Sequence, residues 1–372
     1  MADRIFHLGE FELDSGAVLP DGTLVYRTWG ALNHHRDNAI VVFHSLTGDA
    51  DAATWWAPLF GRGRALDPEK HFIICANLLG SCYGSSGPTS VHPNTGRAWQ
   101  ADFPEITVRD NVRAQRLLAD ALGVQGIDMT IGGSLGGMLA LEWAVTDKRV
   151  RRAVLVATSP AHSAWCIAWS EAQRQAITAD PAWNDGFYAP DRPPAAGLAA
   201  ARMMAMLSYR NATSFEERFG RGVQTSSVEA ESNSSSLNGG SSPPLFAVQA
   251  YLHHQGSKLV DRFDANSYIR LTRMANTHDV GAGRGGREKV LAGIEQDVLV
   301  VGINTDVLFP LAEQQALARQ LPKGTLRVLD SPHGHDAFLL EADRLDALIR
   351  RWQDSLQPAT NQSTLRIPCT ST

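Results

Sequence analysis

The sequence predicts an α/β fold, built on a mostly parallel sheet with an inserted helical cap. Three observations lead to this prediction. Short, continuous apolar runs recur along the chain, which is typical of strands that are buried on both faces. Helical patterns separate several of these runs, and alternating strands and helices form parallel sheets with right-handed crossovers. From about residue 161 to 288, helical stretches follow one another without a clear inner strand, which indicates an insertion.

The composition is that of an ordinary globular protein. The chain has 372 residues, of which 44% are hydrophobic and 20% are charged. A net charge of −5 argues against a nucleic-acid partner, which would need clustered basic residues. The four cysteines show no C-x-x-C spacing, which favours a reducing compartment. The sequence shows neither a signal-peptide pattern nor an apolar run of membrane-spanning length. We therefore expect a cytoplasmic protein without a membrane partner.

The first half of the chain is expected to contain an opening hairpin, two inner strands and a helix. Alternating residues at 11–19 and 23–29 predict two strands, joined by a turn at Pro20-Asp21-Gly22. Apolar runs at 39–43 and 72–76 predict inner strands. A helix is expected to begin at Thr107-Val-Arg-Asp110 and to stop at Gly123.

The chain is organised around Ile131-Gly132-Gly133-Ser134-Leu135-Gly136-Gly137. An apolar run precedes this stretch and a helical pattern follows it, so Ser134 stands at a strand-to-helix turn. The G-x-S-x-G spacing is that of the nucleophile elbow of the α/β-hydrolase fold, in which a strained turn exposes the serine hydroxyl. The backbone N–H of Leu135 would then face any oxyanion formed there. The alternative is a small-residue turn that packs a helix closely on a sheet.

The second half of the chain predicts three further inner strands and a set of cap helices. The strands are expected at 152–157, 297–302 and 325–329, with a last helix at 344–352. The cap helices are expected at 164–178, 197–209, 246–260 and 266–276. The predicted core thus comprises residues 1–160 and 289–357, and the cap comprises residues 161–288. Residues 231–244 are polar and rich in serine, which predicts a disordered loop, and residues 358–372 are expected to be a loose tail.

Two cap histidines, His253 and His254, suggest a metal site at first sight. No Asp, Glu or Cys stands at ligand spacing from them, so we interpret them as a solvated pair and expect no metal.

The catalytic hypothesis needs a base for Ser134 and a carboxylate to orient that base. In this fold the chain order is serine, acid, histidine. Asp306 follows the penultimate strand and His335 follows the last one, so both are expected at the same sheet edge as Ser134. His333 competes for the role of base. We favour His335 because Gly334-His335-Asp336 opens a helix.

Six motifs together resemble the homoserine O-acetyltransferase family, from about residue 8 to 352. They are His44-Ser-Leu-Thr-Gly, Asn77-Leu-Leu-Gly-Ser with Gly-Pro88, Phe103-Pro-Glu-Ile-Thr-Val-Arg-Asp110, Phe263-Asp-Ala-Asn-Ser-Tyr268, Asp306-Val-Leu-Phe-Pro and Gly334-His-Asp-Ala-Phe-Leu339. The stretches Ser163-Ala-Trp-Cys-Ile-Ala-Trp169 and Glu171-Ala-Gln-Arg-Gln175 are most similar to the serine O-acetyltransferases and deacetylcephalosporin C acetyltransferases of this fold.

The resemblance implies an acyltransferase that uses acetyl-CoA as a substrate, needs no bound cofactor and works through an acyl-serine. Ser134, Asp306 and His335 would form the triad, and the backbone N–H groups of Leu46 and Leu135 would form the oxyanion hole. The only expected partners are small-molecule substrates and, in a homodimer, a second copy of the chain.

The resemblance also implies an acceptor site made of Arg202, Tyr209 and Asp336. Arg202 would bind the carboxylate of an amino acid, and Asp336 would pair with its ammonium group. The alternatives are a solvated helix residue for Arg202 and a helix N-cap for Asp336.

The identity of the substrates is left open by the sequence. The expected acceptor is the hydroxyl of serine or homoserine, with serine slightly favoured by the local resemblance, and the donor is acetyl-CoA or succinyl-CoA. A specialised-metabolite alcohol as acceptor is one alternative, and ester hydrolysis by the same triad is another. A binding protein without activity would be expected to lack a triad member, and none is missing here.

Overall fold

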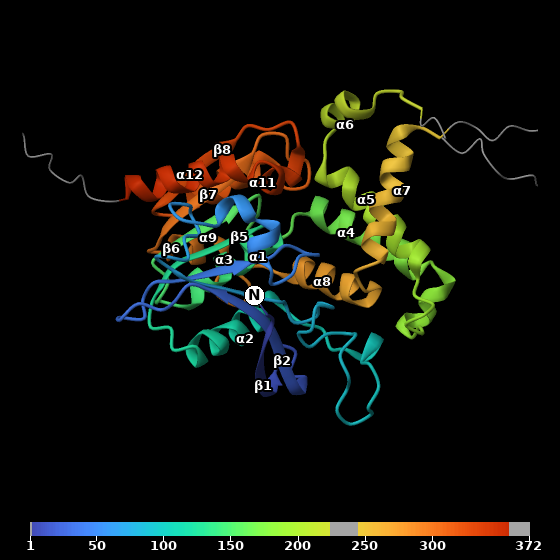
Figure 1. Cartoon of the computed structure of the whole chain (residues 1–372), viewed down its shortest axis with the longest axis horizontal. Helices are drawn as coiled ribbons and strands as arrows, with labels where there is room; N and C mark the ends of the chain where they lie inside the picture. Colours follow the sequence, from blue (N-terminus) through green and yellow to red (C-terminus); the bar gives the residue numbers. More distant parts are fainter. Residues whose placement is uncertain (1, 224–244, 357–372) are drawn as a thin grey trace, which may run out of the picture.

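The computed structural model describes residues 2–223 and 245–356, and one eight-stranded sheet runs through its centre (Figure 1). The strands are β1 (Arg4–Glu12), β2 (Val18–Trp29), β3 (Ala39–Phe43), β4 (Phe72–Ala76), β5 (Ile127–Gly133), β6 (Arg152–Val156), β7 (Asp297–Ile303) and β8 (Gly324–Leu329). Their order across the sheet is β1-β2-β4-β3-β5-β6-β7-β8. The strands from β3 to β8 are parallel, while β1 and β2 add an antiparallel edge. The predicted mostly parallel sheet is therefore confirmed.

The inner strands form where the sequence has continuous apolar runs. Every residue of β3 and β4 is buried, and their bounds are those predicted. Alternate side chains enter two separate cores, because successive residues of a strand point to opposite faces. Val41 and Phe43 contribute to one core, while Ile40 and Val42 contribute to the other. Both faces of the sheet are therefore covered.

Helices cover each face of the sheet. Those outside the region between β6 and β7 are α1 (Ala52–Trp55), α2 (Val108–Ala121), α3 (Leu135–Thr146), α10 (Leu311–Gln320), α11 (Ala337–Leu340) and α12 (Ala342–Ser355), with 3-10 turns η1 (Ala57–Leu59), η2 (Gln100–Asp102) and η4 (Gly334–Asp336). Apolar residues of α2 and α3 belong to the first core, and those of η1, α11 and α12 to the second. Different helices therefore cover the two faces of the sheet.

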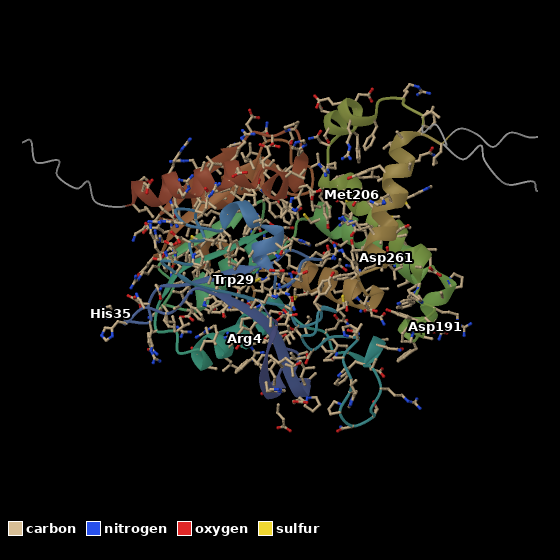
Figure 2. All side chains as sticks on the ribbon, in the orientation of Figure 1. Arg4, Trp29, His35, Asp191, Met206 and Asp261 are labelled. Carbon is tan, nitrogen blue, oxygen red and sulfur yellow. The ribbon has the colours of Figure 1, made fainter. Side chains whose placement is uncertain are left out.

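A helical insert, residues 164–277, separates β6 from β7. It contains α4 (Ala164–Thr178), η3 (Pro181–Gly186), α5 (Ala195–Tyr209), α6 (Ala212–Phe219), α7 (Ala247–Val260) and α8 (Ala265–Thr277), and the short helix α9 (Arg287–Ala292) leads back to the sheet. The four helical stretches expected here are confirmed within two residues at each end. Figure 1 shows α4 to α7 grouped beside the sheet. In Figure 2, Met206 and Asp261 lie on this group, and Trp29 lies on the sheet.

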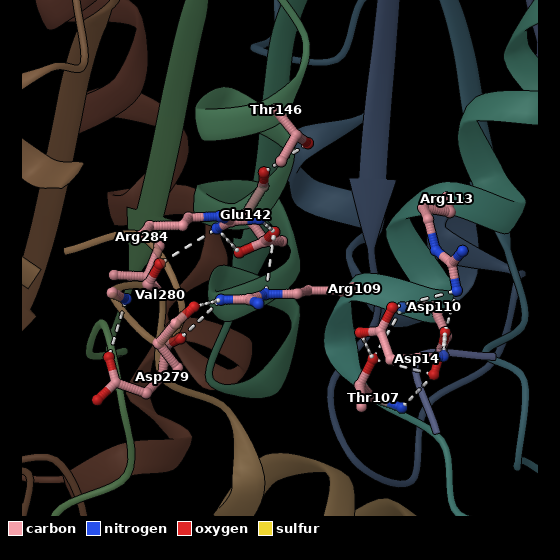
Figure 3. A network of polar contacts seen from close by, with 12 residues as sticks. Asp14, Thr107, Arg109, Asp110, Arg113, Glu142, Thr146, Asp279, Val280 and Arg284 are labelled. Carbon is pink, nitrogen blue, oxygen red and sulfur yellow. Dashed lines mark hydrogen bonds and ion pairs between the residues drawn. The ribbon is translucent and has the colours of Figure 1, made fainter. Parts of the chain in front are cut away.

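Ion pairs of the buried Glu142 carboxylate attach the chain that returns from the insert to the core (Figure 3). Glu142 of α3 is 1% exposed at its side chain, and the Arg284 guanidinium donates to both of its carboxylate oxygens at 2.5 and 2.9 Å. Arg109 of α2 lies 3.7 Å from the same carboxylate and donates to the carbonyl oxygens of Asp279 and Ala282. The segment that returns from the insert is thereby attached to α2 and α3. A buried carboxylate is tolerated there because it is paired.

The start of α2 agrees with its prediction. Thr107 is the N-cap, and Thr107 and Asp110 form a capping box, in which each side chain accepts from the other residue's backbone N–H. Asp14 contacts both residues: its N–H donates to Asp110, and its carboxylate accepts from the Thr107 hydroxyl (Figure 3). The helix ends at Ala121, and Gly123 adopts a φ of 81° just beyond it.

The opening hairpin is present, but its predicted position is wrong: the strands are residues 4–12 and 18–29, instead of 11–19 and 23–29. The turn lies at residues 13–17, where the Leu13 N–H donates to the Ala17 carbonyl, and Gly16 has a φ of 81°. Pro20-Asp21-Gly22 lies inside β2, and Gly22 is opposite Gly9. Two turn-forming stretches stand close together in this part of the chain. The pairing of residues 4–12 with β2 decided between them, and single-residue turn preferences do not encode that pairing.

Other expectations concern segments and sites outside the sheet. The predicted disordered loop, 231–244, and the predicted tail, 358–372, lie outside the described residues. His253 and His254 are exposed, and no group of three metal-ligating side chains occurs in the described part of the chain. No helix among residues 2–223 and 245–356 is long and apolar enough to cross a membrane.

Candidate active site

Ser134 stands in a strained turn between β5 and α3. Its φ and ψ are 57° and −124°, a conformation that is uncommon for a residue with a side chain. Hydrogen bonds to the Ser134 backbone hold the turn. The Ser134 N–H donates to the Val156 carbonyl at 2.9 Å, and the Ser134 carbonyl accepts from the Gly137 N–H and from the Thr158 hydroxyl. The sharp turn predicted from G-x-S-x-G is therefore present.

The glycines on either side of Ser134 are required by close backbone contacts. A Cβ on Gly132 would lie 2.2 Å from the Gly136 carbonyl oxygen, and one on Gly136 would lie 2.3 Å from the Phe43 carbonyl oxygen. Both distances are shorter than any real contact, and backbone atoms cannot move away cheaply. The strand, the turn and the loop after β3 thus approach one another only because these residues have no side chain.

We expect Gly136→Ala to lower the free energy of unfolding by about 1–3 kcal/mol, because the added methyl group forces β3 and α3 apart. Thermal unfolding measures this effect. Gly293→Ala is the matched control, since the nearest atom to its added Cβ lies at an ordinary 3.4 Å. Equal melting temperatures for the two variants would contradict the close-packing argument.

The loop after β3 is fixed against the turn by His44 and Ser45. The Ser45 hydroxyl donates to the Gly133 carbonyl at 3.0 Å. Buried His44 donates from Nδ1 to the Ser45 carbonyl, and its Nε2 accepts from the Leu78 N–H. Burial lowers the pKa of His44, which agrees with this neutral form. These contacts hold the next residue, Leu46, beside the pocket that Ser134 lines.

Two backbone N–H groups are available at this point. Within the described residues, neither the Leu46 N–H nor the Leu135 N–H donates to a protein acceptor. Leu135 is the first residue of α3, whose N–H has no partner within the helix. Both residues line the narrow pocket that contains Ser134. The pair can therefore donate to an oxyanion in that pocket.

Asp306 and His335 form a buried pair at the same sheet edge. The Asp306 Oδ2 lies 2.7 Å from His335 Nδ1, and both side chains are at most 4% exposed. The other carboxylate oxygen of Asp306 accepts the N–H groups of Leu308 and Phe309. His333 is partly exposed, and no hydrogen bond joins its ring to Asp306 among the described residues. The contact with Asp306 leaves Nε2 of His335 as the nitrogen available for proton transfer.

Two opposing effects act on the pKa of His335. Burial alone lowers the pKa of the imidazole, but the charge and hydrogen bond of Asp306 outweigh burial and raise it above its usual value. Phe309, which lines the pocket with Ser134, stacks on the His335 ring with centroids 5.3 Å apart. The Tyr209 ring lies 5.7 Å from the His335 ring. His335 is therefore oriented by a carboxylate and by aromatic packing.

Asp336 already has a partner in the protein. Its Oδ2 lies 3.3 Å from Nε of Arg210, and both side chains are less than a fifth exposed. The Asp336 side chain makes no capping hydrogen bond at the start of α11, which disfavours the N-cap alternative. Burial raises the pKa of Asp336, while Arg210, His335 and Arg202 oppose that rise. A ligand ammonium group would therefore meet a carboxylate that Arg210 also contacts.

Arg202 and Tyr209 lie together on α5. The Arg202 guanidinium lies 5.5 Å from the centre of the Tyr209 ring, within the range of a cation–π contact. Tyr209 lines the pocket with Ser134, and burial raises the pKa of its hydroxyl, which stays protonated. Arg202 is partly buried and acts electrostatically on both Tyr209 and Asp336. This placement disfavours the reading of Arg202 as a solvated helix residue.

Sequence reasoning missed Arg210 and His162. Arg210 directly follows Tyr209, but only its contact with Asp336 distinguishes it from other arginines. His162 lines the pocket with Ser134, and its Nδ1 lies 2.9 Å from the side-chain amide of Asn276. Arg174 can only donate, so the amide oxygen of Asn276 faces Arg174 and the amide nitrogen faces His162. Burial lowers the pKa of His162 to about 4, which keeps its ring neutral.

A larger cleft, of about 810 Å³, lies between residues 279–289 and α10. Its lining includes Arg287, Lys289, Glu288 and Glu313, and none of the site residues predicted from the sequence lines it. Volume alone therefore does not locate the chemistry in this molecule.

Comparisons with known proteins agree with this geometry. The family profile described as the alpha/beta hydrolase fold matches residues 38–342. A homoserine O-acetyltransferase of Salinibacter ruber is 51% identical over 349 residues, which cover 92% of this chain and 95% of that protein.

Two solved structures share the fold along nearly all of the chain. The crystal structure of esterase E22 has a TM-score of 0.84 and 26% identity, covering 94% of this chain and 99% of that one. The homoserine O-acetyltransferase of Bacillus anthracis has the same TM-score and identity, with coverages of 94% and 96%. With half of its residues identical to such an enzyme along almost its whole length, the chain belongs to the homoserine O-acetyltransferase family of the alpha/beta hydrolase fold, a family of acyltransferases.

Proposed function

We propose that this protein transfers the acetyl group of acetyl-CoA to the hydroxyl of homoserine, through an acetyl ester on Ser134. The observation that carries the proposal is the buried Asp306–His335 pair, at the same sheet edge as the Ser134 turn. Such a pair activates a serine by accepting its proton and by stabilising the imidazolium that results. The named relatives favour homoserine over serine as the acceptor, and the reaction then belongs to methionine biosynthesis.

The first half of the reaction forms the acyl-enzyme. Ser134 Oγ attacks the thioester carbonyl while His335 Nε2 accepts its proton. The N–H groups of Leu46 and Leu135 donate to the oxyanion of the tetrahedral intermediate. The carbon–sulfur bond then breaks, and the proton on His335 goes to the departing sulfur of coenzyme A. The acetyl group is left on Ser134.

The second half repeats these steps with the amino acid. The homoserine hydroxyl attacks the acetyl carbonyl, and His335 accepts the hydroxyl proton. When the intermediate collapses, the bond to Ser134 breaks and His335 returns the proton to Oγ. O-acetylhomoserine leaves, and the enzyme is regenerated.

The helical insert is proposed to act as a cap that supplies the acceptor site. Arg202 and Tyr209 lie on α5 of the insert, and Asp336 follows His335 in the core. Arg202 would bind the homoserine carboxylate, and Asp336 would bind the ammonium group. Because Arg210 keeps Asp336 partly neutralised, the ammonium contact is expected to contribute less to binding than the carboxylate contact.

Arg202→Ala is expected to lower kcat/KM for homoserine about thirtyfold, chiefly through KM, because about 2 kcal/mol of charge-assisted hydrogen bonding is lost. The rate of acetyl-enzyme formation from acetyl-CoA should stay near that of the wild type. Arg192→Ala, at an exposed position of the insert, is the control. An unchanged KM for homoserine in Arg202→Ala would contradict the assignment of Arg202 as the carboxylate site.

Hydrolysis of esters is the second candidate function, because an esterase shares this fold at a TM-score of 0.84. The two candidates differ in what removes the acetyl group from Ser134. We expect homoserine to accelerate decay of the acetyl-enzyme far above the rate in buffer alone. Decay at the same rate with and without homoserine would favour the hydrolase.

A further inference from the structure

Gln173 of α4 faces the proposed acceptor pocket, although neither the sequence motifs nor the proposed triad assign it a role. It is 5% exposed and lines the same pocket as Ser134 and Tyr209. Burying an amide costs free energy of folding unless its polar atoms are hydrogen-bonded, so each end of the Gln173 amide is expected to have a partner in the protein or in a ligand.

Tyr268 of α8 determines which end of this amide is free. The Tyr268 hydroxyl donates to Gln173 Oε1 at 2.7 Å. Tyr268 is fully buried, and burial raises the pKa of its hydroxyl well above the usual value, so the hydroxyl remains a donor. The oxygen of the Gln173 amide is thereby satisfied, and the amide nitrogen is directed away from Tyr268.

The amide nitrogen of Gln173 has no protein acceptor among residues 2–223 and 245–356. This nitrogen is not completely enclosed by protein atoms, so it retains some accessible surface. The pocket is the space onto which this buried residue opens. Gln173 therefore presents N–H donors, and no acceptor, to whatever occupies the pocket.

The positive charge of Arg202 lies near this pocket, because its guanidinium is 5.5 Å from the centre of the Tyr209 ring, which lines the pocket. Arg202 and Tyr209 both act electrostatically on the Tyr268 hydroxyl, which is the atom that binds Gln173. A carboxylate accepts about four hydrogen bonds, and a guanidinium supplies two in a bidentate pair. A carboxylate bound by Arg202 in this buried place thus needs further donors, and Gln173 has them.

We propose that Gln173 is a specificity residue, whose amide nitrogen donates to the carboxylate of the amino-acid acceptor, and that Tyr268 positions it. This inference rests on the proposed function and extends its acceptor site. Gln173 and Arg202 would both offer only hydrogen-bond donors to the acceptor. They would select a carboxylate over an uncharged or positively charged group, because only a carboxylate satisfies both residues.

The test compares homoserine with 3-amino-1-propanol, which has the same hydroxyl and amine but lacks the carboxylate. Acetyl-enzyme is formed with one equivalent of acetyl-CoA, and its decay is followed at increasing acceptor concentration. Gln173→Glu is the main variant, because it keeps the shape and the Tyr268 contact but turns an oxygen toward the carboxylate. Gln173→Met, which removes the donors without adding a charge, is the second variant. Gln175→Glu, on the exposed side of α4, is the matched control.

We expect Gln173→Glu to lower the second-order rate constant for homoserine at least a hundredfold, and Gln173→Met to lower it about tenfold. The rate constant for 3-amino-1-propanol should change less than threefold in both, and Gln175→Glu should behave like the wild type. Tyr268→Phe should reproduce part of the Gln173→Met loss with homoserine only.

Equal losses with both acceptors in Gln173→Met would overturn the proposal, because they indicate a structural role. An unchanged rate constant for homoserine in both Gln173 variants would also overturn it. Failure of the proposed function would appear elsewhere, as a wild-type protein that forms no acetyl-enzyme or that homoserine does not deacetylate.

Discussion

Ser134→Ala should form no covalent acetyl adduct when acetyl-CoA is supplied without an acceptor, whereas the wild-type protein should gain one acetyl group. The reason is that the serine hydroxyl is the atom that attacks the thioester, and alanine has none. Turnover should fall by several orders of magnitude, as is typical when a triad nucleophile is removed. Intact-mass spectrometry detects the adduct, and release of free coenzyme A measures turnover.

Thr158, which follows β6 and contacts the Ser134 turn, provides the control. Thr158→Val removes the hydroxyl that donates to the Ser134 carbonyl, 2.8 Å away, but leaves the nucleophile in place. It should retain the acetyl adduct. An adduct of equal yield in Ser134→Ala would show that another residue is acylated, and the proposed mechanism would then be wrong.

His335→Ala should lower turnover by several orders of magnitude, while His333→Ala should change it less than tenfold. Of these two histidines, His335 is the one that contacts Asp306, at 2.7 Å, and it stacks on Phe309, which lines the pocket that contains Ser134. Steady-state release of coenzyme A with homoserine distinguishes the two variants. Full activity in His335→Ala would remove this residue from the mechanism.

The pH profile provides an independent check on His335. A general base acts only when it is unprotonated, so kcat/KM for acetyl-CoA should fall as the pH decreases through the pKa of His335. Burial lowers this pKa, but Asp306 more than compensates, so the acid limb should lie above the usual histidine value of 6.5. Asp306→Asn removes the charge that raises the pKa, and its residual activity should show an acid limb shifted to lower pH. A limb that does not move would contradict the coupling of Asp306 and His335.

Much of the fold was predictable because local sequence patterns are sufficient to determine it. The strands 39–43 and 72–76 are predictable with the observed bounds, since a short, continuous apolar run rich in β-branched residues is typical of a strand in a sheet covered on both faces. The start of α2 was predictable because Thr107 and Asp110 satisfy the first N–H groups of the helix by themselves. The opening hairpin was not, because two turn-forming stretches competed and strand pairing chose between them.

The candidate site divides in the same way. The sequence by itself determined the Ser134 turn, because Gly132 and Gly136 permit backbone contacts that any side chain would block. The sequence was also sufficient to place Asp306 and His335 at one sheet edge, because each follows a predicted parallel strand and parallel strands end on the same side. By contrast, the sequence did not reveal that Arg210 contacts Asp336, or that Tyr268 orients the amide of Gln173. Each of these contacts joins residues that are distant in the chain. The Arg210–Asp336 contact depends on how the helical insert packs on the core, and the Tyr268–Gln173 contact depends on how α8 packs on α4 within the insert. Only the tertiary structure decides that packing.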